Sequence, residues 1–326
     1  MNISKIAKLA GVSNATVSRF LNNGYVSQDN RDKIQKIIDE TGYIPSAHAK
    51  TLRTKKTNLI GIIVPKISSE AVSRMVEGIS TTLSKEGYNI LLGNTNLNIE
   101  KEIEYLNIFK NNQVDGIIFI ATILTPKHLE VMERIKVPII LLGQESENYS
   151  SVYHDDYGAA KSLTKLFIEK GCCKIAFIGV TTQDEAAGAK RKKGYEDALK
   201  EAGRSIDESL IREGEFSSES GYESMRELVN AHPDVDGVFC ATDNIAVGAI
   251  TAIKEKYKDL HGIAIAGIGD SKVSKVITPQ LTSMHYYYKT SGVTAGRMLL
   301  ENLQEEKPII RKVKLGFELQ QRESLN

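Results

Sequence analysis

The sequence lacks any apolar stretch long enough to span a membrane. No run approaches the roughly 20 continuous apolar residues that a membrane helix needs, which excludes a membrane-spanning protein. The first residues, MNISKIAKLAG, also lack the basic, then apolar, then small pattern of a secretory signal, so we expect a cytoplasmic protein. Only three cysteines are present, Cys172, Cys173 and Cys240. Without CxxC spacing they predict neither a disulfide framework nor a zinc site.

Motifs that bind nucleotides or carry out catalysis are also missing. No stretch reads GxGxxG or GxxxxGK[ST], and the nearest match, Gly267–Ile268–Gly269, lacks the third glycine. The six histidines are scattered without an HExxH pair, and no GxSxG elbow occurs. We therefore predict that the protein is not an enzyme and uses neither a cofactor nor a metal.

Charge is unevenly distributed along the 326 residues, which exceed what one hydrophobic core usually fills. Residues 1–56 carry ten Lys or Arg and four Asp or Glu, a net charge of +6, whereas residues 57–326 carry a net charge of −5. A basic head on an acidic body favours a polyanionic partner for the head alone.

The head has the signals of a helix-turn-helix. Asn2 can cap a first helix that ends at Gly11, Ser13 can cap a second helix over residues 14–22, and a third helix is expected between Ser27 and Gly42. We expect one face of the first helix to pack inward, comprising Ile6, Ala7, Leu9 and Ala10. The alternative is a small three-helix bundle with a basic surface.

In a helix-turn-helix the exposed face of the second helix enters the major groove. The side chains available there are Asn14, Ala15, Thr16, Ser18 and Arg19. Arg19 is suited to bidentate recognition of guanine. Ser13 and Ser18 are better suited to phosphates, which position the protein without specifying sequence.

The body alternates short apolar runs with amphipathic segments, which predicts repeated βαβ units. The predicted strands lie within NLIGIIVP, NILLGN, GIIFIA and VPIILLG, followed by KIAFIGV, GVFCA and IAIAGIG. Continuous apolar strands indicate parallel sheets covered by helices on both faces. We predict an α/β body of two doubly wound lobes, with a ligand cleft at the carboxyl ends of the strands. Lys66 follows the first strand at this edge.

The head sequence IAKLAGVSNATVSRFLNN and the later runs TGYIPSAHAKTLRTKKTNLIGIIVP and CATDNIAVGA resemble the lac repressor (LacI/GalR) family over nearly the full length. The resemblance implies a periplasmic-binding-protein-like sensor domain behind a DNA-binding head. It also implies a hinge helix at Ser46–Arg53, in which Leu52 wedges into the minor groove and Arg53 and Lys55 lie near phosphates. Eight residues are too few for a stable helix in water, so this helix should form only with a partner. A disordered linker is the alternative.

The resemblance also implies the domain limits and the effector site. It places the head at 1–44, the hinge and linker at 45–57, and the sensor at 58–326, with lobe 1 at about 58–153 and 285–315 and lobe 2 at about 156–282 and 318–326. Crossings between the lobes are expected near residues 153–156, 282–285 and 315–318. The implied effector contacts are Lys66, Gln144, Asp155, Arg191, Phe216, Thr242 and Asp243. Where many members have an acidic sugar ligand, this chain has Gly269.

These features predict a sequence-specific repressor of a disaccharide operon, most similar to trehalose and sucrose repressors, which binds a pseudo-palindromic operator as a homodimer. The alternatives are a corepressor-type or catabolite regulator of the same family, a sugar receptor without DNA function, and an enzyme with a regulatory head. A phosphorylated disaccharide, trehalose 6-phosphate first, is the expected effector, with Lys66 and Arg191 holding its anionic end. The alternatives are a neutral sugar such as sucrose and a Lys66 that is only a solvated surface lysine.

Overall fold

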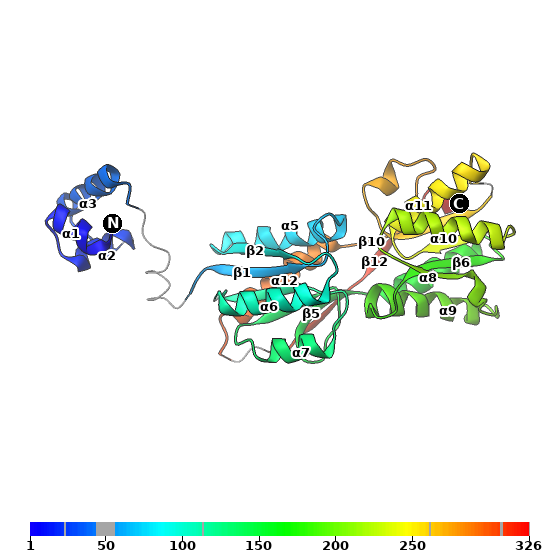
Figure 1. Ribbon diagram of the computed structural model, residues 1–326, viewed down its shortest axis with the longest axis horizontal. Coiled ribbons are helices and arrows are strands. Elements are labelled where there is room, and N and C mark those ends of the chain that lie inside the picture. The colour runs from blue at the N-terminus through cyan, green and yellow to red at the C-terminus, as the bar shows by residue number, and fades with distance from the viewer. Residues whose placement is uncertain (23, 44–55, 113, 261, 307–308, 326) are drawn as a thin grey trace. The chain divides into compact units, whose positions relative to one another are not determined.

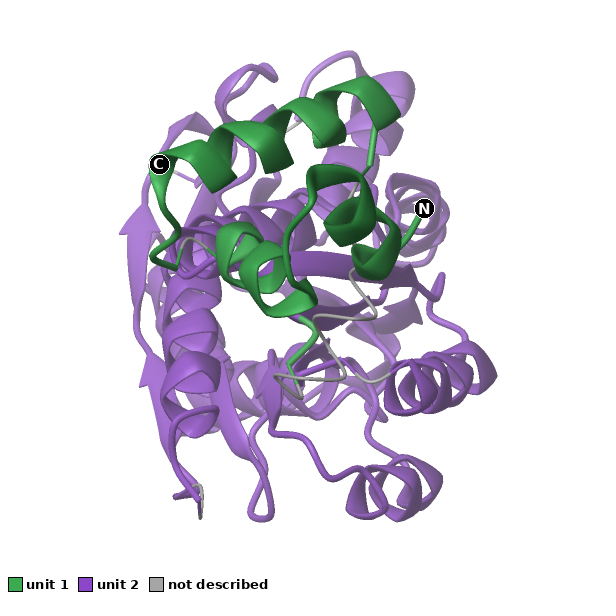
Figure 2. Ribbon diagram, turned by 90° about the vertical axis from the view of Figure 1, so that its left-hand side faces the viewer, with its two compact units in different colours: residues 1–57 green, residues 58–326 purple. Residues whose placement is uncertain are grey.

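The computed structural model describes residues 1–22, 24–43, 56–112, 114–260, 262–306 and 309–325. It divides into two compact units, residues 1–57 and 58–326, coloured separately in Figure 2. The predicted hinge helix at Ser46–Arg53, including Leu52, Arg53 and Lys55, lies outside the described residues. No helix of the described part is both long and apolar enough to cross a bilayer.

The first unit contains the three predicted helices, α1 (Ile3–Ala10), α2 (Asn14–Leu21) and α3 (Gln28–Thr41). The Asn2 side chain caps α1, and Gly11 and Gly42 end α1 and α3 in the left-handed conformation, as their sequence positions predict. The buried centre comprises Ile6, Ala7, Ala10, Val17, Val26 and Ile34. Leu9 was predicted to pack inward but is 52% exposed, because it lies outside the narrow stripe through which this short helix contacts its neighbours.

The second unit contains two six-stranded sheets, and we call the part built on each sheet a lobe (Figure 1). The lobe 1 sheet is parallel throughout, in the order β11 (Lys312–Leu315), β5 (Ser150–His154), β4 (Ile139–Leu142), β3 (Gly116–Ile120), β1 (Leu59–Val64), β2 (Asn89–Asn94). Its helices are α5 (Glu70–Lys85), α6 (Ile99–Asn111), α7 (Pro126–Glu133) and α12 (Tyr288–Asn302).

The lobe 2 sheet has the order β12 (Phe317–Gln320), β10 (Thr282–Tyr286), β9 (Ala264–Gly269), β8 (Gly237–Cys240), β6 (Ile175–Val180), β7 (Ile211–Gly214). Only β12 is antiparallel to its neighbour. The helices of this lobe are α8 (Asp156–Glu169), α9 (Arg191–Glu201), α10 (Ser218–Ala231) and α11 (Asp243–Tyr257), with a π-helical turn η1 (Glu185–Lys190) and short 3₁₀ turns η2 (Glu208–Leu210), η3 (Val273–Lys275) and η4 (Glu323–Leu325).

Three segments connect the lobes. The chain passes from β5 to α8, from β10 to α12 and from β11 to β12. The second crossing was expected near residues 282–285, and because β10 pairs with β9 and β12 as far as its last residues, it begins after Tyr286. Backbone pairing keeps this strand in lobe 2 until the sheet edge is reached.

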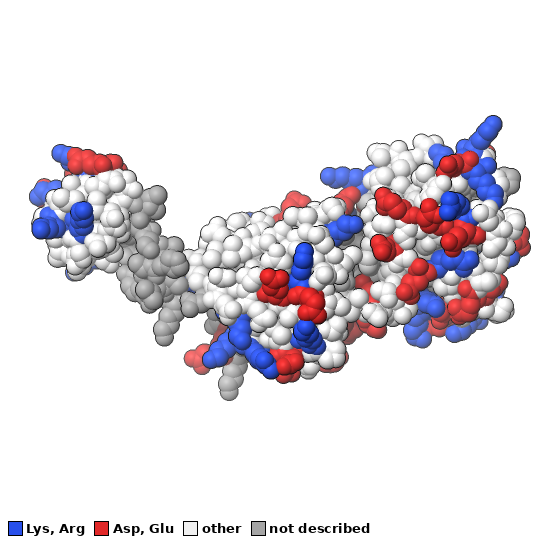
Figure 3. Space-filling view, viewed as in Figure 1, with Lys and Arg blue, Asp and Glu red and all other residues white. Residues whose placement is uncertain are grey.

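The strand β2 departs from the expectation that every apolar strand is covered on both faces. It forms an edge of the lobe 1 sheet, and Leu91 and Leu92 are 39% and 37% exposed. Figure 3 shows few charged side chains in the region of β2, whereas both signs intermingle over lobe 2. An apolar edge strand with so little charge is suited to contact with another protein surface.

Candidate functional site

The second helix of the first unit presents the predicted DNA-contacting residues. Asn14, Ala15 and Arg19 are exposed, and Thr16 and Ser18 are partly exposed. The Ser13 hydroxyl is already engaged as the N-cap of α2, accepting the Thr16 backbone N–H at 3.1 Å. At Ser13 a DNA phosphate can still be attracted by the N-terminal end of α2, which carries a partial positive charge. Arg19 has no ion-pair partner among the described residues, so the N–H groups of its guanidinium are available to donate hydrogen bonds to DNA.

A cavity of about 240 Å³ lies between the two lobes, where strand ends of both sheets meet. Of the predicted effector contacts it is lined by Lys66, Gln144, Arg191, Phe216, Thr242 and Asp243. Each follows the carboxyl end of a strand, except Arg191, which begins α9. The cavity therefore lies at the carboxyl ends of the strands, where the ligand cleft was predicted.

Asp155, by contrast, does not line the cavity. Its side chain caps α8 by accepting the Gly158 backbone N–H at 3.2 Å, and it lies 3.5 Å from the Lys314 ammonium. The neighbouring residue Asp156 turns into the cavity instead and is 3% exposed. Successive side chains at the start of a helix point in different directions, which is why Asp156 lines the cavity and Asp155 does not.

Arg191 and Asp156, which both line the cavity, form a buried ion pair. The Nε and one terminal nitrogen of Arg191 each lie 2.7 Å from Asp156 Oδ1, and a second terminal nitrogen donates to the Ala241 carbonyl. The Tyr286 hydroxyl donates to the same Asp156 oxygen at 3.0 Å. Burial opposes the charge of Arg191, but Asp156 outweighs it and the pKa of Arg191 is raised. Its charge is thus largely neutralised within the protein.

Gln144 and Asp184 join the two lobes across the cavity. The Gln144 amide nitrogen donates to Asp184 at 2.9 Å and to the Thr122 carbonyl at 2.6 Å. Asp184 also accepts the backbone N–H groups of Ala186 and Ala187 and so caps η1. Burial raises the pKa of Asp184, while these hydrogen bonds oppose the shift.

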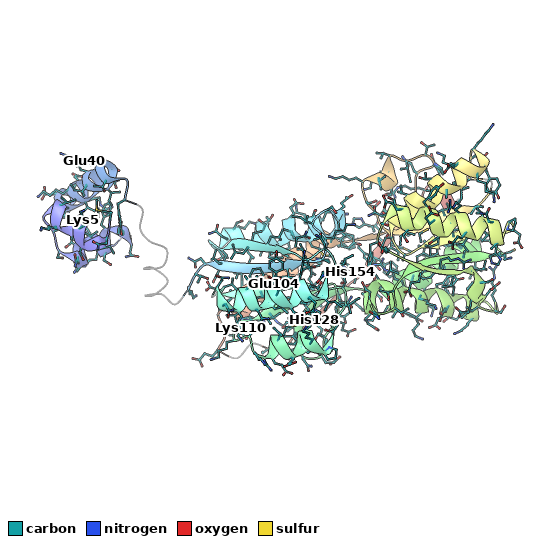
Figure 4. All side chains as sticks on the ribbon, viewed as in Figure 1. Lys5, Glu40, Glu104, Lys110, His128 and His154 are labelled. Carbon is teal, nitrogen blue, oxygen red and sulfur yellow. The ribbon has the colours of Figure 1, made fainter. Side chains whose placement is uncertain are left out.

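An aromatic wall that sequence analysis did not predict completes the cavity. His154 is stacked on Tyr286 with ring centroids 4.6 Å apart, and the Tyr288 ring meets it edge-on at 5.2 Å. Figure 4 labels His154 at the junction of the lobes. Burial lowers the pKa of His154 to about 4, so its imidazole is neutral near pH 7.

Several cavity residues were missed for an identifiable reason. His154 and Asp156 stand on either side of Asp155 in the run YHDDYG, but only the fold shows which of them face inward. Asp184, Tyr286 and Tyr288 follow strands or crossings that were not tied to the site. The described residues contain no group of three His, Cys, Asp or Glu side chains able to hold a metal ion.

Gly267, in the partial nucleotide motif Gly267–Ile268–Gly269, makes room for a buried carboxylate. A methyl group on Gly267 would lie 2.7 Å from Asp243 Oδ1. The bare backbone therefore makes room for the Asp243 carboxylate, which is buried and accepts the Ser283 hydroxyl at 2.6 Å and the Ser271 backbone N–H at 2.7 Å. Burial raises the pKa of Asp243.

Comparison with known proteins agrees with this architecture. Residues 2–46 match the bacterial regulatory proteins of the lacI family, and residues 57–323 match the periplasmic binding proteins and sugar binding domain of the LacI family. The chain is 36% identical over 320 residues to a sucrose operon repressor of Staphylococcus xylosus, covering 97% of this chain and 99% of the relative. It is 33% identical over 328 residues to catabolite control protein A of Priestia megaterium, covering 99% of both.

Among solved structures, a complex of the transcriptional regulator CelR with cellobiose is similar, with a TM-score of 0.76, 28% identity and 99% coverage of both chains. A DNA-binding head followed by a two-lobed sugar-binding domain defines a bacterial transcriptional regulator. The chain belongs to the LacI family. The predicted family and fold class are confirmed, and the family consists of regulators rather than enzymes, as predicted.

Proposed function

We propose that this protein represses an operon for the use of a neutral disaccharide, binds its operator in the cytoplasm as a homodimer, and senses the sugar in the cavity between its lobes. The observation that carries the proposal is a buried cavity lined by carboxylates and aromatic rings in a chain that also presents an exposed recognition helix. The repressor of Staphylococcus xylosus is named for a sucrose operon, and sucrose is therefore the first candidate effector.

The charges of the cavity favour a neutral sugar over the phosphate ester that the sequence predicts. Three buried carboxylates line the cavity, Asp156, Asp184 and Asp243. Arg191 is already paired with Asp156, and Lys66 is exposed at the rim. Arg74 also lines the cavity, with its guanidinium over the Tyr288 ring, but an anionic phosphate would still meet the buried carboxylate of Asp243. Sugar hydroxyls can instead donate to carboxylates, and aromatic faces can pack on the sugar ring.

The homodimer is supported by the apolar edge of lobe 1, where Leu91 and Leu92 of β2 are exposed. A recognition helix of eight residues reads only a few base pairs, and two-fold doubling of the site on a pseudo-palindromic operator supplies the remaining affinity. The hinge helix proposed at Ser46–Arg53 would also gain its partner from the second chain.

The proposal is tested by fluorescence anisotropy on DNA upstream of the protein's own gene, with sucrose, trehalose, cellobiose and their 6-phosphates. We expect two chains per pseudo-palindromic site and a change in operator affinity of at least about tenfold with one neutral disaccharide, equivalent to about 1.4 kcal/mol. The sign of the change separates an inducer from a corepressor. A response to a 6-phosphate alone would contradict the neutral effector, and one chain per site would contradict the homodimer.

Replacement of Arg19 by alanine should relax base preference at one position of each half-site, at a cost of about 1–3 kcal/mol, because a bidentate contact to one base edge is lost. Lys55→Ala is the matched control. We expect it to lower the affinity for every operator sequence by the same factor, and to reduce by about one the slope of the logarithm of the affinity against the logarithm of the salt concentration. Titrations of single-base operator variants at several salt concentrations measure both. A change of base preference in Lys55→Ala but not in Arg19→Ala would reverse the two roles.

A further inference from the structure

We infer that Tyr288, Asp243 and the bare backbone of Gly269 form a subsite that recognises two neighbouring hydroxyl groups of the effector. In this arrangement Tyr288 donates a hydrogen bond to one sugar oxygen, and Asp243 accepts a hydrogen bond from the other hydroxyl. The inference deepens the proposed function and rests on it, since it assumes a sugar in the cavity.

Gly269 defines the space of this subsite. It is the last residue of β9, lines the cavity and has φ of +140°, a conformation that side-chain-bearing residues rarely adopt. A methyl group on Gly269 would lie 3.4 Å from Asp243 Oδ2 and 3.9 Å from the Tyr288 hydroxyl oxygen. The two polar groups therefore border the same space beside this glycine.

Asp243 retains acceptor capacity toward that space. The side chain is buried; Oδ1 accepts the Ser283 hydroxyl and Oδ2 accepts the Ser271 backbone N–H, with the Ser271 hydroxyl close by. An ionised carboxylate offers about four lone-pair positions, and no basic side chain of the described residues forms an ion pair with Asp243. A buried carboxylate with so few partners is stabilised by a further donor, which a sugar hydroxyl supplies.

Tyr288 supplies the donor. Its ring is 8% exposed and is held by His154 edge-on at 5.2 Å, by Tyr286 at 5.8 Å and by the Arg74 guanidinium 5.7 Å from the ring centre. The hydroxyl makes no hydrogen bond to another described residue. Burial raises the pKa of Tyr288 to about 12, so the hydroxyl keeps its proton near neutral pH.

Sugar specificity follows from this geometry. A fixed ring aims one donor, and a fixed carboxylate aims one acceptor, at a space that no side chain fills. Two adjacent sugar hydroxyls match both groups, whereas a sugar that lacks one of them leaves Tyr288 or Asp243 without a partner in a buried site. Leaving a buried polar group unpaired is the strongest basis on which a binding site rejects an analogue.

The test is calorimetry with the sugar of the panel that binds the unmodified protein most tightly, and with the series of its monodeoxy analogues. We expect Tyr288→Phe, which removes only the hydroxyl, to weaken binding of the parent sugar about fivefold to tenfold. Tyr287→Phe is the matched control, because Tyr287 is the adjacent residue, is exposed and donates to Glu318 instead. We expect its sugar affinity to equal that of the unmodified protein.

The deoxy series supplies a second measurement that does not depend on the variant. One monodeoxy analogue should bind the unmodified protein at least about tenfold more weakly than the parent, and Tyr288→Phe should no longer distinguish the two. Equal affinity of Tyr288→Phe and the unmodified protein for the parent sugar, or uniform affinity across the deoxy series, would overturn the subsite and leave the proposed function intact. Failure of every panel sugar to bind the unmodified protein would overturn both.

Discussion

Replacing Arg191 with methionine is expected to lower the free energy of unfolding by about 3–5 kcal/mol, because Asp156 loses its buried cation. The substitution leaves Asp156 buried with the Tyr286 hydroxyl as its neutral donor, and it removes the donor to the Ala241 carbonyl. A buried carboxylate that loses its cation bears an uncompensated desolvation cost, which is larger than the net gain of the original pair. Urea denaturation followed by circular dichroism measures the loss.

Two further variants separate charge from packing. Lys193→Met places the same side chain on the solvent side of α9, where Lys193 makes only an exposed i,i+4 pair with Asp197, and should change stability by less than about 0.5 kcal/mol. Asp156→Asn combined with Arg191→Met removes the unpaired charge and should recover most of the loss. A single Arg191→Met variant as stable as Lys193→Met would show that Asp156 does not need its cation.

His154 is expected to make the protein less stable as pH falls from 6.5 to about 4. Burial lowers the pKa of His154 from 6.5 to about 4. Between these two pH values His154 is protonated in the unfolded chain but remains neutral in the folded protein. Its stabilising contribution is complete above pH 6.5 and is lost as the pH falls to about 4. A difference of one between the folded and unfolded pKa corresponds to about 1.4 kcal/mol, so the expected loss is about 3 kcal/mol.

The effect is isolated by comparing His154→Phe with the unmodified protein, because other groups titrate equally in both. Phenylalanine keeps a flat ring to stack on Tyr286 and cannot be protonated. The stability difference between the two proteins should grow by about 3 kcal/mol between pH 6.5 and 4 in favour of the variant. His232→Asn, at the C-terminal end of α10, is the control that removes a histidine outside the cavity. A parallel curve for His154→Phe would show that His154 becomes protonated at little cost.

The helices of the head and the class of the body could be predicted from the amino-acid sequence. Helix ends depend on interactions within a few residues: Asn2 and Ser13 accept backbone N–H groups of their own helices, and Gly11 takes the left-handed conformation that ends α1. The buried central strands are similarly evident, because a strand covered on both faces needs a continuous apolar run. Because these signals depend only on residues close together in the chain, they can be predicted without knowledge of the tertiary structure.

Which residues meet depends instead on the tertiary structure. The strands β5, β7, β10, β11 and β12 were not predicted individually, since their polar composition and position beside other strands mark them only once the sheets assemble. The choice of Asp156 over Asp155 depends on where α8 begins, and the contact of Tyr288 with His154 joins residues from two separate crossings. Leu91 and Leu92 are apolar enough for a core, yet they lie on an edge strand and are 39% and 37% exposed. These outcomes depend on contacts between segments far apart in the chain, whose geometry no local pattern contains.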